Sequence, residues 1–159
     1  MRIFTAINLP EAAKSVLEQH QEELKKRLNF PVKWVDKKSF HITLLFFGYL
    51  NQKGLEKLLS EAEKKAKETP SFNIVLDKIC YAPPGKLPRM IWAMGKADRD
   101  LGIVPHVTLC RMDRPILDEL PLVEEDIDVS FKVRKIDVMK SILKKEGPEY
   151  ELLASYNLK

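Results

Sequence analysis

A four-residue pattern that occurs twice is the feature that most constrains the structure of this chain. His41-Ile42-Thr43-Leu44 returns as His106-Val107-Thr108-Leu109, in a sequence with three His and four Thr in all. Residues i and i+2 of a β-strand face the same side, so each His shares a face with its Thr, and the two apolar residues share the other face. Each copy therefore predicts a strand that packs against a core on one side and presents an imidazole and a hydroxyl to a cleft on the other. Repetition of the pattern favours two related lobes whose half-sites meet.

The remaining sequence predicts more strands than helices. Apolar periodicity and turn residues predict two helices, over residues 11–28 and 51–69, and at most a short helix over 115–120. Strands are expected at residues 2–8, 34–35, 40–47, 72–81, 89–95, 104–111, 131–143 and 149–158. Strands and helices do not alternate regularly, which favours antiparallel sheets in an α+β fold. A length of 159 residues is typical of a single domain, so we expect one domain over 1–159.

Composition indicates a globular protein without a membrane segment. Hydrophobic residues make up 45% and charged residues 31% of the chain, and no apolar run approaches the roughly 18 residues that a membrane span needs. The first residues are too few and too polar for a signal peptide, which predicts a cytoplasmic protein. A net charge of +4 favours an anionic partner without the dense basic surface that long duplex requires.

Two imidazoles and two hydroxyls in one cleft suit acid–base chemistry on a phosphate ester. One His can accept a proton from water while the other donates a proton to the leaving oxygen. Thr hydroxyls can donate hydrogen bonds to non-bridging phosphate oxygens. This chemistry predicts no metal, no cofactor and no covalent intermediate. His20 lies on a predicted helix without a nearby Thr, so a structural or solvated role is expected for it.

Zinc and a cysteine nucleophile are the competing interpretations of the same residues. Zinc takes three or four ligands, and Asp36 and Asp113 do not lie at ligand spacing from the two motifs. Cys110 shares the predicted face of Thr108, but no third group is identifiable that would orient a base for it. Cys80 and Cys110 lie far apart and outside any CxxC spacing, so we expect two reduced thiols.

At these residues the chain resembles the 2H phosphoesterase superfamily, and most of all its RNA 2′,3′-cyclic phosphodiesterases, also called 2′–5′ RNA ligases. The similarity runs nearly from end to end. It includes the opening strand, the two motif regions and a terminal hairpin, at residues 2–10, 34–48, 105–111 and 140–150. The resemblance implies a bilobal α+β fold, with two antiparallel sheets facing a central cleft and helices on the outside.

The resemblance also implies an activity and roles for individual residues. The implied reaction is metal-independent hydrolysis of an RNA 2′,3′-cyclic phosphate to a 2′-phosphate, with reverse 2′–5′ ligation as a side activity. His41 corresponds to the proton donor and His106 to the proton acceptor, while Thr43 and Thr108 hold the phosphate. The expected partners are cyclic-phosphate RNA ends or nucleotides, and we expect a monomer.

Two further residues are candidates for substrate contact. Arg111 follows Thr108 by three residues, as the family pattern requires of a phosphate contact, and a guanidinium suits that role. Strict alternation from His106 puts Arg111 on the opposite face, so a bulge or the end of the strand must turn it. Phe4 is a candidate for the floor of the cleft, where its ring would stack against a base.

Other functions remain open at this point. The same cleft could bind a nucleotide or RNA end without turnover, or act on a 2′–5′ oligoadenylate or an ADP-ribose cyclic phosphate. Members of the family usually carry a helix between the strand that includes Ile91–Gly95 and the second motif, but residues 96–104 are too few for one. The chain is therefore either a compact member or one that lacks residues there.

Overall fold

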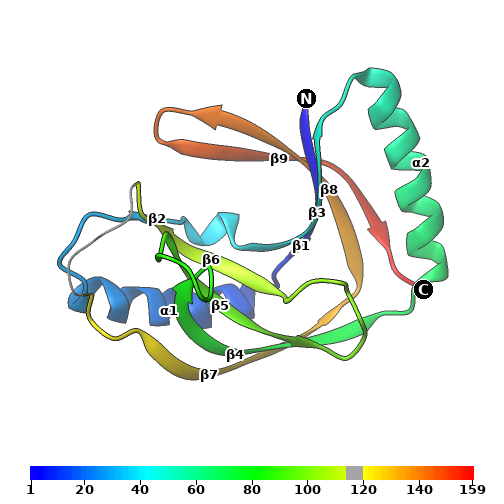
Figure 1. Cartoon of the computed structure of the whole chain (residues 1–159). Helices are drawn as coiled ribbons and strands as arrows, with labels where there is room; N and C mark the ends of the chain where they lie inside the picture. Colours follow the sequence, from blue (N-terminus) through cyan, green and yellow to red (C-terminus); the bar gives the residue numbers. More distant parts are fainter. Residues whose placement is uncertain (114–119) are drawn as a thin grey trace.

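The computed structural model describes residues 1–113 and 120–159 and contains two antiparallel sheets (Figure 1). A four-stranded sheet has the order β3-β1-β8-β9 and a five-stranded sheet the order β2-β6-β5-β4-β7. The short helix expected at 115–120 falls, except for Leu120, on residues 114–119, which lie outside the described residues. The strands are β1 Arg2–Asn8, β2 Lys33–Trp34, β3 His41–Tyr49, β4 Phe72–Ala82, β5 Met90–Ala97, β6 His106–Arg111, β7 Glu124–Val133, β8 Lys135–Lys144 and β9 Gly147–Asn157.

Helix α1, Glu11–Arg27, follows a strand of the four-stranded sheet but packs in the core of the other sheet. It begins directly after Pro10, with Glu11 near the positive end of the helix dipole. Its buried residues Leu17 and Leu24 share a cluster with Val107 and Leu109 of β6. This helix therefore packs directly against the apolar side of the second motif strand.

Helix α2, Gln52–Glu68, covers the four-stranded sheet. Asn51 caps it, because the side-chain oxygen of Asn51 accepts a hydrogen bond of 2.8 Å from the backbone N–H of Gly54. Leu55 and Leu58 pack against Ile3 of β1 and Val138 of β8. One helix thus packs against each sheet, which confirms the α+β architecture expected from the sequence.

The structure corrects one strand of the sequence prediction. The single strand expected over 131–143 is two strands, β7 and β8, which end and begin on either side of Arg134 and belong to different sheets. Residues 124–130 extend β7 beyond the prediction. Its exposed face is polar and begins with three acidic residues, while Ile127, Val129 and Val133 are buried on the other face. The boundary was concealed because residues 131–143 contain no Gly or Pro to mark the end of one strand and the start of the next.

The connector between β5 and β6, residues 98–105, contains no helix and no strand. Part of it, with α2 and β3, lines a groove of about 610 Å³. The backbone N–H of Gly95 donates to the carbonyl of Pro105 at 3.1 Å, which fixes the chain directly before the second motif. Among the described residues, no helix is both long and apolar enough to span a membrane.

Candidate active site

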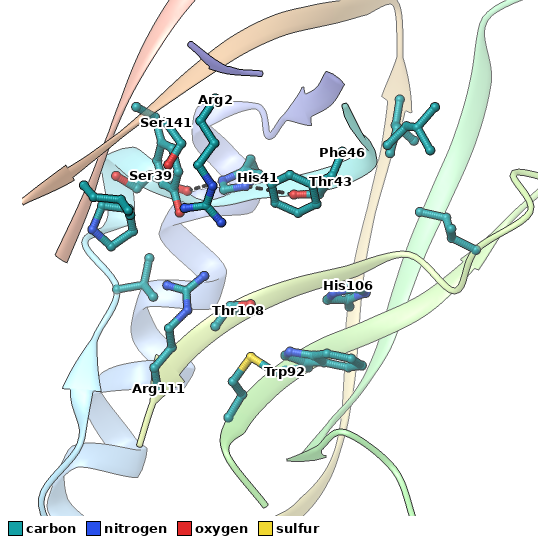
Figure 2. A pocket seen from close by; sticks show the side chains of 18 residues that line it. Arg2, Ser39, His41, Thr43, Phe46, Trp92, His106, Thr108, Arg111 and Ser141 are labelled. Atoms are coloured by element: carbon teal, nitrogen blue, oxygen red, sulfur yellow. Dashed lines mark hydrogen bonds between the residues drawn. The ribbon is translucent and has the colours of Figure 1, made fainter. Parts of the chain in front are cut away.

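The two motif strands bring both His-x-Thr pairs to one cleft between the sheets. His41 and Thr43 project from β3, and His106 and Thr108 project from β6, into a cavity of about 490 Å³ (Figure 2). Ile42 and Val107, the intervening β-branched residues, are fully buried. The alternation expected from the sequence therefore holds in both motifs, and the four polar side chains face one space.

Both imidazoles are held in the same way. The Nδ1 atom of His41 lies 2.7 Å from the carbonyl oxygen of Ser39, and the Nδ1 atom of His106 lies 2.9 Å from that of Val104. A carbonyl oxygen can only accept, so each Nδ1 carries the hydrogen, and Nε2 remains for other partners. The Nε2 atom of His41 lies 3.2 Å from the hydroxyl of Thr43, which can donate to it. The two motifs therefore share this contact as well: in each, the backbone carbonyl two residues before the His holds its Nδ1 atom.

Each motif strand contains a bulge directly after its Thr. On β3, Thr43 pairs with Ala6 and Leu45 with Thr5, which leaves Leu44 without a partner on β1. On β6, Thr108 pairs with Trp92 and Cys110 with Ile91, so Leu109 is left over in the same way. The extra residue reverses the alternation.

The two bulges return the third residue after each Thr to the cleft. That residue is Arg111 in the second motif and Phe46 in the first, and both line the cavity. The bulge supplies the turn that Arg111 needed in order to face the site. Phe46 occupies the corresponding place in the first motif and was not expected there from the sequence.

An aromatic cluster forms the floor of the cleft beside His41. The ring of Phe4 lies 5.4 Å from the rings of both His41 and Phe46 and 5.5 Å from that of Tyr150. Phe4 is only 1% exposed, so its neighbours occupy the surface that a base would need. Phe4 lies beneath the rings that line the cavity and is not itself a lining residue, so its burial does not fit the expected stacking role. Phe46 is 59% exposed and offers an accessible ring instead.

The ring of Trp92, on β5, stacks against His106. The two centroids are 3.8 Å apart and the ring planes are 21° from parallel. The indole therefore packs flat against one face of the imidazole. Trp92 thus restricts the orientation of the second His from one side, while Val104 holds its Nδ1.

The cleft is cationic. Arg2 and Arg111 line it together with the two His, and no Asp or Glu is among its described lining residues. Burial lowers the pKa of His41, the hydrogen bond to the Ser39 carbonyl raises it, and the positive charges of Arg111 and His106 lower it further. In the free protein these effects together favour neutral His41. A bound anion would oppose the influence of the cationic groups and favour the imidazolium form.

The two cysteines are free thiols, as expected. Burial raises the pKa of Cys110 to about 12, so its thiol is protonated at neutral pH and is a poor nucleophile. Burial also raises the pKa of Cys80. Within residues 1–113 and 120–159, no three His, Cys, Asp or Glu side chains are grouped in a way that could hold a metal ion.

Besides Phe46, the lining residues that were not identified from the sequence include Arg2, Trp92, Ser141 and Tyr150. Arg2 and Phe4 are two residues apart on one strand, and alternation from Phe4 could have identified Arg2. Trp92 pairs with Thr108 across β5 and β6, a relation that depends on strand order. Ser141 and Tyr150 are paired on β8 and β9, which also requires the sheet topology.

Comparison with known proteins agrees with this fold. Residues 7–92, more than half of the chain, match the model of the family described as LigT like phosphoesterase. A protein of Thermotoga maritima named RNA 2′,3′-cyclic phosphodiesterase is 26% identical over 176 aligned positions, which cover 96% of this chain and 93% of the relative. The alignment is longer than the 159 residues of this chain, so the relative contains segments that this chain lacks.

Solved structures match the whole fold. A crystal structure of a Thermus thermophilus protein superposes with a TM-score of 0.84 at 24% identity, covering 99% of this chain and 98% of the other. The crystal structure of E. coli LigT complexed with phosphate gives a TM-score of 0.75 at 23% identity, covering 99% of this chain and 96% of that one.

Two antiparallel sheets that present paired His-x-Thr strands to one cationic cleft define the two-histidine class of phosphoesterases. Within that class, the chain belongs to the LigT-like phosphoesterase family.

The charge of Arg111 provides a test of the electrostatics of the cleft. We expect His41 to titrate below its ordinary pKa of about 6.5, and Arg111→Gln to raise that pKa, because the substitution removes a cation that opposes protonation. Titration of the imidazole proton resonances by NMR, with His41 assigned from His41→Ala, measures both effects. Arg134→Gln is the control, since Arg134 is exposed and lies between β7 and β8. An unchanged or lower pKa of His41 in Arg111→Gln contradicts the expectation.

Proposed function

We propose that this protein hydrolyses RNA 2′,3′-cyclic phosphate ends to 2′-phosphates by general acid–base catalysis, without a metal ion. The observation that carries the proposal is the common anchoring of the two imidazoles. Each Nδ1 donates to the carbonyl two residues earlier, so Nε2 is the atom that each imidazole presents to the cleft, and that of His41 lies beside the Thr43 hydroxyl. The name of the Thermotoga maritima relative supports the choice of substrate.

The reaction assigns one proton transfer to each histidine. Nε2 of His106 accepts a proton from the water that attacks phosphorus, and Nε2 of His41 donates a proton to the 3′ oxygen as the phosphorus–O3′ bond breaks. The products are a free 3′ hydroxyl and a 2′-phosphate. Thr43, Thr108 and Arg111 bind the non-bridging oxygens and stabilise the charge that develops on them. The reverse reaction joins a cyclic phosphate to a 5′ hydroxyl as a 2′–5′ bond.

The donor role of His41 requires its protonated form. In the free protein burial lowers the pKa of His41, and the charges of Arg111 and His106 lower it further, against the hydrogen bond to Ser39. A cyclic phosphate carries one negative charge, and its binding beside His41 stabilises the imidazolium. Substrate binding therefore prepares the acid. Because the two lobes contribute one half-site each, we further propose that residues 1–159 function as one domain.

The experiment is incubation with adenosine 2′,3′-cyclic phosphate and with an oligoribonucleotide that ends in a cyclic phosphate, both in EDTA. Chromatography then separates 2′-phosphate from 3′-phosphate products. We expect turnover in EDTA and a 2′-phosphate product. A 3′-phosphate product contradicts the roles of the two histidines, and loss of activity in EDTA contradicts metal independence. Binding of a 2′-phosphate nucleotide without turnover of either cyclic substrate identifies a binding module instead.

A further inference from the structure

Arg2 lies in the cleft but has no part in the reaction as proposed. It is the first residue of β1, paired with Tyr49 of β3 on one side and Ser141 of β8 on the other. Figure 2 shows its side chain extending from the wall of the four-stranded sheet into the cavity, toward the side chain of Arg111, which extends from the opposite wall. Two guanidinium groups therefore enter one site from two sheets.

The pairing of β1 with β3 places an aromatic layer between Arg2 and the first motif. His41 and Thr43 are opposite Asn8 and Ala6, whereas Phe46 is opposite Phe4. Arg2 is four residues from Ala6, which corresponds to about 13 Å along an extended strand. The backbone of Arg2 thus lies beyond the paired Phe4 and Phe46, on the side away from the motif His and Thr.

The charge of the cleft exceeds what one cyclic phosphate requires. A cyclic phosphate has a single negative charge. The place proposed for it, between the two His-x-Thr motifs, already has Arg111 and two imidazoles around it. Arg2 forms no ion pair with any residue in 1–113 or 120–159. A guanidinium without an acidic partner in a cleft is suited to a phosphate oxygen. The arrangement fits a ligand with two anionic groups on either side of an aromatic surface.

We propose that Arg2 binds a second phosphate of the substrate, the one on the 5′ side of the nucleotide that bears the cyclic phosphate. This inference rests on the proposed function. In an RNA end closed as a 2′,3′-cyclic phosphate, the other phosphate of the terminal nucleotide is at its 5′ position. The base of that nucleotide lies against the exposed ring of Phe46, between the two phosphate sites. The site consequently prefers a cyclic end with a 5′ phosphate group to a bare cyclic nucleoside.

The test compares three substrates that differ in the 5′ group: adenosine 2′,3′-cyclic phosphate, its 5′-phosphorylated form, and the dinucleotide ApA with a terminal cyclic phosphate. For the wild-type protein we expect kcat/KM to be at least about tenfold higher for the two substrates with a 5′ phosphorus group. A preference for the dinucleotide alone assigns the site to the phosphodiester of an RNA chain. An equal preference for the 5′-phosphorylated nucleotide and for the dinucleotide means that the site accepts a 5′ phosphate monoester as well as a phosphodiester.

Arg2→Gln should remove this preference. We expect kcat/KM for the dinucleotide to fall about tenfold more than for the cyclic nucleoside, mostly through KM, and Arg2→Lys to retain part of the difference. The slope of log kcat/KM against log salt for the dinucleotide should also become shallower, by about 0.7 for one lost phosphate contact. A merely structural role for Arg2 changes neither the substrate ratio nor the salt slope.

The control is Arg134→Gln, which removes the same charge from an exposed position outside the cleft. An unchanged substrate ratio and salt slope in Arg2→Gln, with the three substrates still turned over, overturns the role of Arg2 and leaves the proposed function intact. If the wild-type protein turns over none of the three substrates, the proposed function itself fails. The two failures are therefore distinguishable in one set of measurements.

Discussion

Replacement of either motif histidine by alanine should reduce kcat on a 2′,3′-cyclic phosphate by about 100- to 10,000-fold, the usual contribution of a positioned acid or base. His41→Ala removes the proposed proton donor, and His106→Ala the acceptor. The double variant should lose less than the product of the two single losses, because an acid and a base that act in one step are not independent. Steady-state rates in EDTA, with product identified by chromatography, measure all three.

His20→Ala is the matched control for these variants. His20 lies on α1, does not line the cleft, and has no neighbouring Thr in the sequence. Circular dichroism melting curves of all variants separate loss of chemistry from loss of structure, since His41 and His106 are half-buried and each forms a hydrogen bond to the backbone. Wild-type rates in both His41→Ala and His106→Ala contradict the proposed reaction.

Much of the fold was predictable because alternation is a strong local signal. β1 and β3 have apolar and β-branched residues in patterns that require no tertiary information, and α2 begins at the expected cap, Asn51. The boundary at Arg134 was not predictable in this way. No Gly or Pro separates β7 from β8 in the sequence, and the two strands are distinguished by their partners, which belong to different sheets.

Some residues of the site could likewise be predicted from local alternation, and others could not. His41, Thr43, His106 and Thr108 follow from alternation within two short strands, and the structure brings them to one cavity. The side chains that complete the cleft depend on strand order and on bulges, which involve partners distant in the sequence. The shared spacing of the repeat would have been sufficient for Phe46, because Phe46 follows Thr43 by the three residues that separate Arg111 from Thr108.

Gly95 on β5 is expected to be intolerant of any side chain. A Cβ at this position would lie 1.8 Å from the carbonyl oxygen of Val75 and 2.7 Å from the α-carbon of Leu76, both backbone atoms of β4. The close approach coincides with a register shift in β4 between Leu76 and Lys78. Gly95→Ala must therefore separate two central strands of the five-stranded sheet.

We expect Gly95→Ala to lower the free energy of unfolding by about 3 kcal/mol, at the upper end of the cost of overpacking. For a chain of this size that corresponds to a fall in Tm of about 6–12 °C, which thermal melting would detect readily.

Gly54→Ala is the control, because its Cβ would meet nothing closer than the Asn51 side-chain oxygen at 3.3 Å and alanine favours a helix. The backbone N–H of Gly95 also fixes Pro105, directly before His106, so displacement of β5 should reduce phosphodiesterase activity below the melting temperature as well. A variant that melts like the wild type would mean that β4 and β5 separate at no cost, and that the support of the second motif does not depend on this contact.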